Sequence, residues 1–454
     1  MSEHKHTARR DPAEAAAGAR ARTEGRMELT PLPDGSYRVS RLKLGDENKR
    51  YWHKNEKGET VWEAFPETVT LPDCVSEVGH LSCPNLGEIV LPPSVREIGD
   101  LAFGIEIYTG DAVQHYALHT VHLSQGLRRI GWRAFYNCHA LDGVHLPKGL
   151  EEIEEDAFRT CTSLTRITIP ESVGYIATRA FAYCSSLEKV IFREGVTALH
   201  EGAFCGDRAL RTVILPQTLR AICYACFEDC TSLAEIDLPE GLTDLFAYAF
   251  KNCRALKMLT FRRALNNRED AHKKSPFFGC ESLTEIRLEK EVETVAWLPA
   301  APALMRYTVP TDHPTLRAEG GVLYSKDKKQ LLRVPAGLCG EFSVPRGVEV
   351  IAENAFRGCD KITEIALPST LIRIGDAALA GCSALRSIDL PGKLTEVGTR
   401  AFADCTSLTS VHISGSVKEI GEDAFAGCSA LTDLTVSPQN RHYTAEGEKL
   451  QKRQ

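Results

Sequence analysis

Cysteine is the residue type in this chain that can take part in the widest range of reactions, and the chain has 16 cysteines among 454 residues. Thiols can form disulfides, bind zinc as thiolates or act as nucleophiles. Eleven of them share one position of a sequence repeat: Cys83, Cys138, Cys161, Cys184, Cys230, Cys253, Cys280, Cys359, Cys382, Cys405 and Cys428. Repeated positions stack with parallel side chains, whereas a disulfide needs facing Cβ atoms about 3.8 Å apart. The spacing therefore favours a ladder of buried free thiols over a disulfide framework.

Three cysteines, Cys223, Cys226 and Cys230, have the metal-like spacing C-x-x-C-x-x-x-C. Zinc is usually held by four ligands, and the sequence offers no evident fourth ligand beside these three. Cys230 occupies the repeated cysteine position, while Cys226 and Cys223 replace the small Ala and Gly of other repeats. We interpret all three as structural residues and predict no bound metal. Zinc binding is the alternative.

Histidines gather in one part of the chain, at His115, His119, His122, His139 and His145. His122 and His145 share one strand position in neighbouring repeats, so their imidazoles are expected to be adjacent on the predicted sheet. Two adjacent imidazoles can hold a metal or respond to pH near neutrality. The simpler interpretation is a group of solvated surface histidines.

Neither a nucleophile with its base nor a phosphate-binding loop is evident in the sequence. Gly320-Gly321 begins a hairpin and lacks the following helix that a phosphate cradle requires. Acidic residues are scattered over the predicted strands, and paired carboxylates for hydrolysis need a facing geometry that a flat ladder seldom provides. We therefore predict that the protein is not an enzyme and has no catalytic residues and no cofactor.

A 23-residue repeat explains why these residues recur so regularly. Each unit is marked by one large apolar residue: Phe135, Phe158, Phe181, Phe204, Phe227, Phe250, Phe356, Leu379, Phe402 and Phe425. Within one unit, Leu164 opens a phrase in which Ile167 and Ile169 alternate, as in a short strand that Pro170 ends. Stacked copies would form a parallel sheet with strands about 4.8 Å apart. Residues 180–184 are expected to form a short helical turn, with each Phe stacked on the Phe of the next unit.

The complete pattern, Leu-x-x-Ile-x-Leu-Pro-x-x-Leu-x-x-Ile-Gly-x-x-Ala-Phe-x-x-Cys, resembles the BspA-like leucine-rich repeats over roughly residues 66–436. The resemblance implies an α/β solenoid, that is, a right-handed leucine-rich-repeat superhelix with a concave parallel β-sheet. Short strands and helical turns would cover its convex side. Proteins of this family are often found on the cell surface or secreted, and some are adhesins that bind host matrix proteins.

The organisation of the chain follows from where the repeat starts, breaks and stops. Residues 307–345 look like a β-hairpin insert, with strands at Val322–Tyr324 and Leu331–Val334. Insertions at 104–117 and 262–276 are expected to be exposed loops. Translation could begin at Met1 or at Met27. The expected segments are a disordered N-terminal tail (1–27), an N-terminal cap (28–65), a first block of repeats (66–306), the hairpin insert (307–345), a second block (346–436) and a C-terminal cap or tail (437–454).

Charge and hydropathy exclude several classes of partner. The formal net charge of -7 argues against nucleic acid, whose phosphates require a concentrated basic face. No apolar run approaches the roughly 18 residues that would cross a bilayer, so no membrane partner is predicted. The N-terminus has charges but no apolar core of a signal peptide, which indicates the cytoplasm. A monomer is expected, and the family resemblance keeps a surface or secreted location as the alternative.

Binding is expected on the concave sheet, where the residues that flank the inward strand positions face solvent. An apolar centre with a charged rim is typical of protein interfaces, although single exposed apolar residues are normal on any sheet. The predicted protein-binding residues are Arg166, Lys189, Ile191, Thr212, Ile214, Glu235, Asp237 and Met258. We therefore predict a non-catalytic scaffold that binds an unidentified protein. The alternatives are an adhesin for host matrix proteins and a glycan-binding or enzymatic role.

Overall fold

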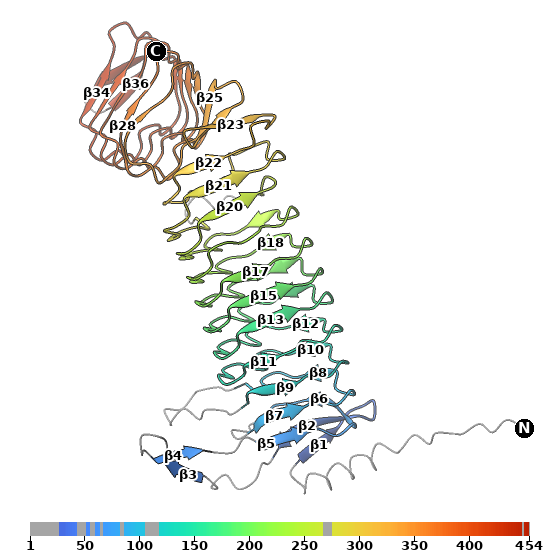
Figure 1. The fold of residues 1–454 in the computed structure, drawn as a ribbon. Coiled ribbons are helices and arrows are strands. Elements are labelled where there is room, and N and C mark those ends of the chain that lie inside the picture. Colours follow the sequence, from blue (N-terminus) through green and yellow to red (C-terminus); the bar gives the residue numbers. More distant parts are fainter. Residues whose placement is uncertain are drawn as a thin grey trace, which may run out of the picture. The chain divides into compact units, whose positions relative to one another are not determined.

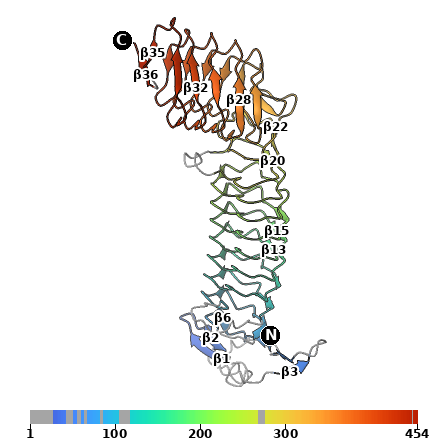
Figure 2. The same ribbon diagram turned by 90° about the vertical axis from the view of Figure 1, so that its left-hand side faces the viewer.

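The computed structural model describes residues 27–42, 51–54, 60–63, 67–81, 86–104, 118–266, 275–446 and 449–453. The chain divides into two compact units, Met1–Leu233 and Ala234–Gln454. Within each unit the chain winds in successive coils whose strands lie side by side (Figures 1 and 2). The predicted repeat therefore corresponds to a β-solenoid.

One coil of the first unit shows how the repeat folds. Leu164 is buried and leads into strand β13 (Arg166–Ile169), whose side chains alternate between exposed and buried. After the turn at Pro170 a second, two-residue strand follows, β14 (Tyr175–Ile176), with Ile176 fully buried. Stacked copies of the first strand form what we call the long-strand sheet, and copies of the second form the short-strand sheet. Both sheets send their apolar side chains into one narrow core.

The first unit builds these sheets from strands 23 residues apart that pair in parallel, as β13 does with β15 and β14 with β16. The β1–β2 hairpin is antiparallel, and β2 pairs in parallel with β6, so the hairpin extends the short-strand sheet at its N-terminal end. This hairpin lies where a cap was expected. The strands are β1 (Met27–Pro31), β2 (Tyr37–Leu42), β3 (Tyr51–Lys54), β4 (Thr60–Glu63), β5 (Glu67–Thr70), β6 (Val75–Val78), β7 (Leu86–Val90), β8 (Glu97–Ile98), β9 (Thr120–His122), β10 (Arg129–Ile130), β11 (Gly143–Val144), β12 (Glu152–Ile153), β13, β14, β15 (Lys189–Phe192), β16 (Ala198–Leu199), β17 (Thr212–Ile214) and β18 (Ala221–Ile222).

The second unit repeats this plan on both sides of the insert. Its long strands pair in parallel as β20-β21-β22, β26-β28 and β30-β32-β34, and its short-strand sheet has the order β23-β24-β25-β27-β29-β31-β33. The strands are β19 (Asp244–Leu245), β20 (Met258–Phe261), β21 (Glu285–Leu288), β22 (Arg306–Thr308), β23 (Leu316–Glu319), β24 (Val322–Ser325), β25 (Gln330–Arg333), β26 (Gly340–Ser343), β27 (Val350–Ile351), β28 (Ile362–Ala366), β29 (Arg373–Ile374), β30 (Ser387–Asp389), β31 (Glu396–Val397), β32 (Ser410–Ile413), β33 (Glu419–Ile420), β34 (Asp433–Val436), β35 (Tyr443–Glu446) and β36 (Lys449–Lys452).

The insert is part of the core of the second unit. The two strands predicted within it are present as β24 and β25, which pair antiparallel, and β25 pairs in parallel with β27. Arg333, on β25, is almost completely buried, and its guanidinium donates hydrogen bonds to the carbonyl oxygens of Asn354 and Leu298. The insert thus joins residues that precede it in the chain to residues that follow it.

The predicted helical turn is wrong, because the described residues contain no helix. In the segment around Phe181, both Arg179 and Tyr183 have positive φ, at 54° and 61°, which an α-helix does not allow. The N–H groups of Arg179, Phe181 and Tyr183 donate to carbonyl oxygens of Glu201, Ala203 and Cys205. Alternate N–H groups therefore bond to the next coil, and a ladder of tight turns replaces the helix.

The predicted stack of aromatic rings is confirmed. In the first unit Phe103, Phe135, Phe158, Phe181, Phe204 and Phe227 form one continuous stack, with ring centroids 4.9 to 5.6 Å apart. The second unit stacks Phe250 on Phe277 and Phe402 on Phe425. These rings fill the interior between the turns and the two sheets.

Several expectations concern residues outside the described part of the chain. These are the N-terminal tail up to residue 26, Cys83, His115 and most of the insertions at 104–117 and 262–276. Among the residues that the structure does describe, no helix is long and apolar enough to cross a membrane.

Candidate functional site

The centre of the predicted binding face lies on the long-strand sheet of the first unit. Strands β13, β15 and β17 pair in register, which places Ile191 between Thr168 and Ile214. The predicted contiguity of Ile191 and Ile214 is therefore confirmed. Ile214 is 48% exposed, but Ile191 is only partly exposed, because it has a strand neighbour on each side. The sequence predicts that both isoleucines face solvent, and Ile191 does so only in part.

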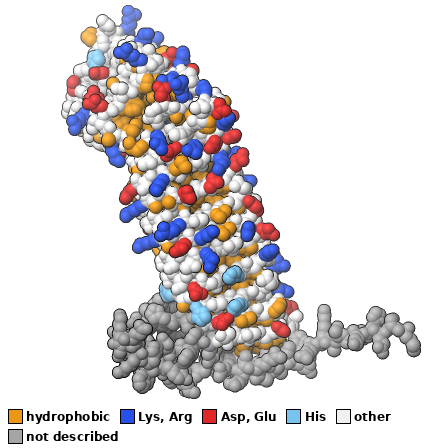
Figure 3. All heavy atoms as spheres, in the orientation of Figure 1, with side chains coloured by type: hydrophobic (Ala, Val, Ile, Leu, Met, Phe, Trp, Pro, Cys, Tyr) orange, Lys and Arg blue, Asp and Glu red, His pale blue; other side chains and the backbone are white. Residues whose placement is uncertain are grey.

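Basic side chains flank these isoleucines on the same strands. Arg166, Lys189 and Thr212 pair in register and are all exposed. Arg211, just before Thr212, is also exposed and was missed in the sequence analysis. Figure 3 shows Lys and Arg side chains over β13, β15 and β17.

The acidic side chains close to this face do not neutralise it. None of Arg166, Lys189 and Arg211 forms an ion pair with another residue that the structure describes. Glu188, directly before β15, is also exposed, and its main-chain oxygen accepts the N–H of Arg211. Glu194 lies beyond the end of β15, where its carboxylate oxygens accept the main-chain N–H groups of Gln217 and Thr218.

The other three predicted residues belong to the second unit. Glu235 and Asp237 are exposed and lie outside any strand, and Asp237 pairs with Arg262 at 2.7 Å. Met258, on β20, is 38% exposed and is paired with Glu285 on β21. Within this unit, Met258 therefore lies next to a charged side chain and not within an apolar patch.

The predicted histidine pair lies on the long-strand sheet nearer the N-terminus. His122 and His145 each follow directly after the in-register pair Val121 and Val144. The His122 Nε2 lies 2.6 Å from the Oε1 of Glu88, and this hydrogen bond is the largest cause of the lowered pKa of Glu88. His122 is therefore engaged by a carboxylate. In the part of the chain that the structure describes, no group of three or more His, Cys, Asp and Glu side chains is arranged to hold a metal.

The cysteines of the repeated position are free, and all those described are buried except Cys428, which is partly exposed. Several of their thiols donate the same kind of hydrogen bond, to a carbonyl oxygen of the preceding coil. The Sγ of Cys184 donates to the carbonyl oxygen of Phe158 at 3.2 Å, and that of Cys161 donates likewise to Phe135. Burial raises the pKa of both thiols. A protonated, buried thiol is a poor nucleophile and a poor metal ligand, so the role of this ladder is structural.

The three cysteines whose spacing resembles a metal site are also explained as structural residues. Cys226 and Cys230 are buried, Cys223 is partly exposed, and Cys230 donates to the carbonyl oxygen of Phe204 as a member of the ladder. Burial raises the pKa of Cys226 well above its ordinary value.

One repeat has an aspartate in the cysteine ladder. Asp207 is completely buried, and its Oδ1 accepts the N–H of Cys184 at 2.8 Å. Its Oδ2 is buried without a hydrogen-bond partner among the described residues. Burial raises the pKa of this carboxyl well above its ordinary value. The sequence analysis missed Asp207, although the signal was present, since it lies three residues after Phe204 where other repeats have Cys.

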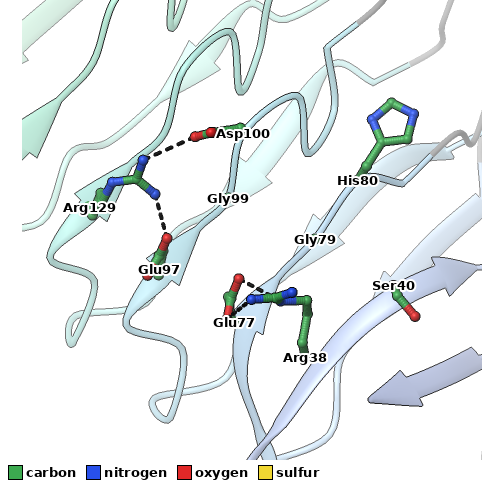
Figure 4. Close-up of a pocket in the computed structure, with 9 residues that line it drawn as sticks. All are labelled: Arg38, Ser40, Glu77, Gly79, His80, Glu97, Gly99, Asp100 and Arg129. Carbon is green, nitrogen blue, oxygen red and sulfur yellow. Dashed lines mark hydrogen bonds and ion pairs between the residues drawn. The ribbon is translucent and has the colours of Figure 1, made fainter. Parts of the chain in front are cut away.

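A groove of about 540 Å³ lies on the short-strand sheet near the N-terminus of the first unit. Figure 4 shows that its charged side chains point toward one another across β2, β6, β8 and β10. The lining residues are Arg38, Ser40, Glu77, Gly79, His80, Glu97, Gly99, Asp100 and Arg129.

The charges of this groove are largely paired within the protein. Arg129 forms ion pairs with Glu97, Asp100 and Glu154, and Arg38 pairs with Glu77 at 2.6 Å. Burial alone would lower the pKa of Arg129, but hydrogen bonding to Glu154 and the nearby carboxylate charges raise it overall. Arg129 therefore stays charged, and the groove holds a set of interlocked ion pairs.

Comparisons with known proteins agree with this geometry. The family model described as BspA type leucine rich repeat region matches residues 110–219, 198–297 and 339–445. These matches cover more than half of the chain, so the protein belongs to the BspA-type leucine-rich-repeat family. No curated protein sequence matches the chain.

Solved structures add further relatives. A leucine-rich repeat protein from Bacteroides ovatus is 26% identical, with a TM-score of 0.54 over 90% of this chain and 92% of that one. A leucine rich cell surface protein from Faecalibacterium prausnitzii is 24% identical over 91% and 93%, with a TM-score of 0.34. A leucine rich repeat protein from T. pallidum is 27% identical over 51% and 88%, with a TM-score of 0.37. The first of these supports the solenoid fold.

Proposed function

We propose that this protein is a non-catalytic scaffold that binds another protein through the long-strand sheet of its first unit. The observation that carries the proposal is the exposed Ile214 in register beside Ile191, flanked by cations that have no ion-pair partner among the described residues. An apolar centre with a polar, charged rim is the usual composition of a protein interface. Membership of the leucine-rich-repeat family also supports a role in protein interaction.

The test is a double substitution, Ile191→Glu with Ile214→Glu, measured by pull-down of partners with the full chain. Neither isoleucine is fully buried, so each change should alter the free energy of unfolding by only about 0.5 kcal/mol. We expect the double variant to lose its partner while its unfolding stays close to that of the unsubstituted protein.

The matched control is Tyr175→Glu with Ala198→Glu, two paired and partly or largely exposed positions on the short-strand sheet of the same unit. This control adds the same two charges on a different face and should keep the partner. A third variant, Lys326→Glu, changes the exposed turn of the insert without disturbing its buried strands. If the turn variant or the control loses the partner and the isoleucine variant keeps it, the binding face lies elsewhere.

We also propose that the protein works in a reducing compartment, which agrees with the cytoplasmic location expected from the sequence. The support is the set of free thiols, since disulfides form and persist mainly in oxidising compartments. Cell fractionation tests this proposal, and recovery of the protein in the medium or at the cell surface would contradict it.

A further inference from the structure

Basic side chains are exposed on the long-strand sheet of the first unit, close to Ile191 and Ile214. Three exposed cations belong to three consecutive coils: Arg166 on β13, Lys189 on β15 and Arg211 directly before β17. None of them has an ion-pair partner among the described residues. Some basic residues elsewhere in the same unit do pair with carboxylates: Arg129 contacts several, and Arg128 pairs with Glu151 at 3.1 Å. The chain as a whole has a net charge of -7, so unpaired cations on one face are a local feature.

From this charge distribution we infer that the partner presents an acidic, extended polypeptide segment that also carries apolar side chains. The inference rests on the proposed function, because it names the chemistry of the partner at the same face. Carboxylates of the segment would pair with Arg166, Lys189 and Arg211, while its apolar side chains would cover Ile191 and Ile214.

The geometry of the face suits a short segment. Three neighbouring strands span about 10 Å at the sheet spacing, a distance that about three extended residues cover. Extended residues send alternate side chains to opposite sides. A segment with an acidic and an apolar residue two positions apart therefore presents both on one side. Electrostatic complementarity of this kind mainly sets specificity and the rate of association.

Nucleic acid is the other polyanion that such a face could attract. Ile191 and Ile214 offer nothing to a phosphate. The exposed Glu188, which precedes Lys189 and whose main-chain oxygen accepts the Arg211 N–H, would repel a continuous phosphate backbone. A polypeptide can place apolar and uncharged groups beside Glu188, because its charges are separate. The observations therefore favour the acidic polypeptide.

The experiment uses the full chain and three fluorescent peptides of about ten residues, which is longer than the face needs. All three peptides repeat two residues of one tested type followed by two Val, so that each side of the extended peptide presents both kinds of side chain. The tested residue is Glu, Gln or Lys. Fluorescence anisotropy should show that the Glu peptide binds about tenfold more tightly than the Gln peptide, since exposed charge pairs each contribute little. This preference should shrink as salt is added, and the Lys peptide should bind most weakly.

Two triple variants locate the effect. Arg166→Ser with Lys189→Ser and Arg211→Ser should remove the preference for Glu over Gln. The matched control, Arg96→Ser with Arg128→Ser and Arg179→Ser, makes the same change in net charge at exposed positions off this face and should keep the preference.

Several outcomes would overturn the inference. It is wrong if the Glu and Gln peptides bind equally, if the Glu peptide does not bind, or if both triple variants behave alike. It is also wrong if a DNA oligonucleotide binds as tightly as the Glu peptide and is lost in the first triple variant. The proposed function has its own test. It is wrong if the variant with Ile191→Glu and Ile214→Glu still captures its protein partner.

Discussion

Replacing Asp207 by cysteine should stabilise the first unit, and the gain should increase with pH. The buried Oδ2 of Asp207 has no hydrogen-bond partner in the described part of the chain, which typically costs about 1–3 kcal/mol. A cysteine at this position could donate to the carbonyl oxygen of Phe181, as Cys184 donates to that of Phe158. The N–H of Cys184 would lose Asp207 but regain the Phe181 carbonyl, as Cys161 N–H uses Phe158. We expect a net gain of about 1–3 kcal/mol at neutral pH.

The pH dependence follows from the raised pKa of the buried Asp207 carboxyl. Below the ordinary value of 3.8 the carboxyl is protonated in both the folded and the unfolded chain, so its protonation favours neither state. As the pH rises further, only the unfolded chain ionises, and the free energy of unfolding falls by up to about 1.4 kcal/mol per pH unit. The fall ends when the pH passes the folded pKa. The neighbouring thiols Cys184 and Cys205 also have raised pKa values, that of Cys205 being about 11, so they stay neutral in this range.

The assay is urea unfolding of the unsubstituted protein, Asp207→Cys and Asp207→Asn between about pH 5 and pH 8. Asp207→Asn is the matched control, because it keeps an oxygen for the Cys184 N–H but cannot ionise. Both variants should show a weaker fall in stability with pH than the unsubstituted protein. If all three proteins change in parallel, or if Asp207→Asn is the least stable at high pH, Asp207 is ionised in the folded protein and the reasoning is refuted.

Two further predictions concern the core. Phe181→Ala should lower the free energy of unfolding by about 3–5 kcal/mol, because the ring is fully buried between Phe158 and Phe204. Phe181→Leu is its control and should cost less, since Leu fills part of the same space, as Leu379 does in the second unit; equal costs for the two variants would mean that the filled volume is not what stabilises the core. Thiol titration should show few reactive groups in the native protein and nearly all 16 after denaturation, and disulfides on non-reducing gels would contradict the parallel stacking of the ladder.

The sequence predicted the core of this fold well because the repeat constrains every coil in the same way. Phe181 and Cys184 recur at fixed spacing, and only stacking on like residues explains that recurrence. The helical turn was predicted wrongly because residues 180–184 have no feature that excludes a helix. Positive φ at Arg179 and Tyr183 is imposed by hydrogen bonds to the next coil, which are long-range contacts that local residue preferences do not reveal.

The sequence predicted which residues of the candidate site lie side by side, but not how much of each side chain is exposed. A fixed period places Ile191 beside Ile214, and the structure confirms that pairing. How much of each side chain is covered depends on the lengths and conformations of neighbouring side chains, as the partly covered Ile191 shows. Lys189 and Arg211 form no ion pair with any residue that the structure describes, and this likewise depends on rotamers, which the sequence does not specify.

The core and the binding face meet in one coil. The carbonyl oxygen of Phe158 accepts both the N–H of Cys161 and the thiol of Cys184, so each ladder cysteine ties one coil to the coil before it. Asp207 replaces that tie in the coil that carries β17 and Ile214. The N–H of Leu210 donates to the main-chain oxygen of Asp207 at 3.0 Å, two residues before β17 begins. Because coils of a solenoid contact only their neighbours, ionisation of Asp207 should loosen β17 before more distant strands. The strand that presents Ile214 therefore follows a ladder position with a buried oxygen that has no hydrogen-bond partner among the described residues, and Asp207→Cys should slow amide exchange in β17 more than in β13.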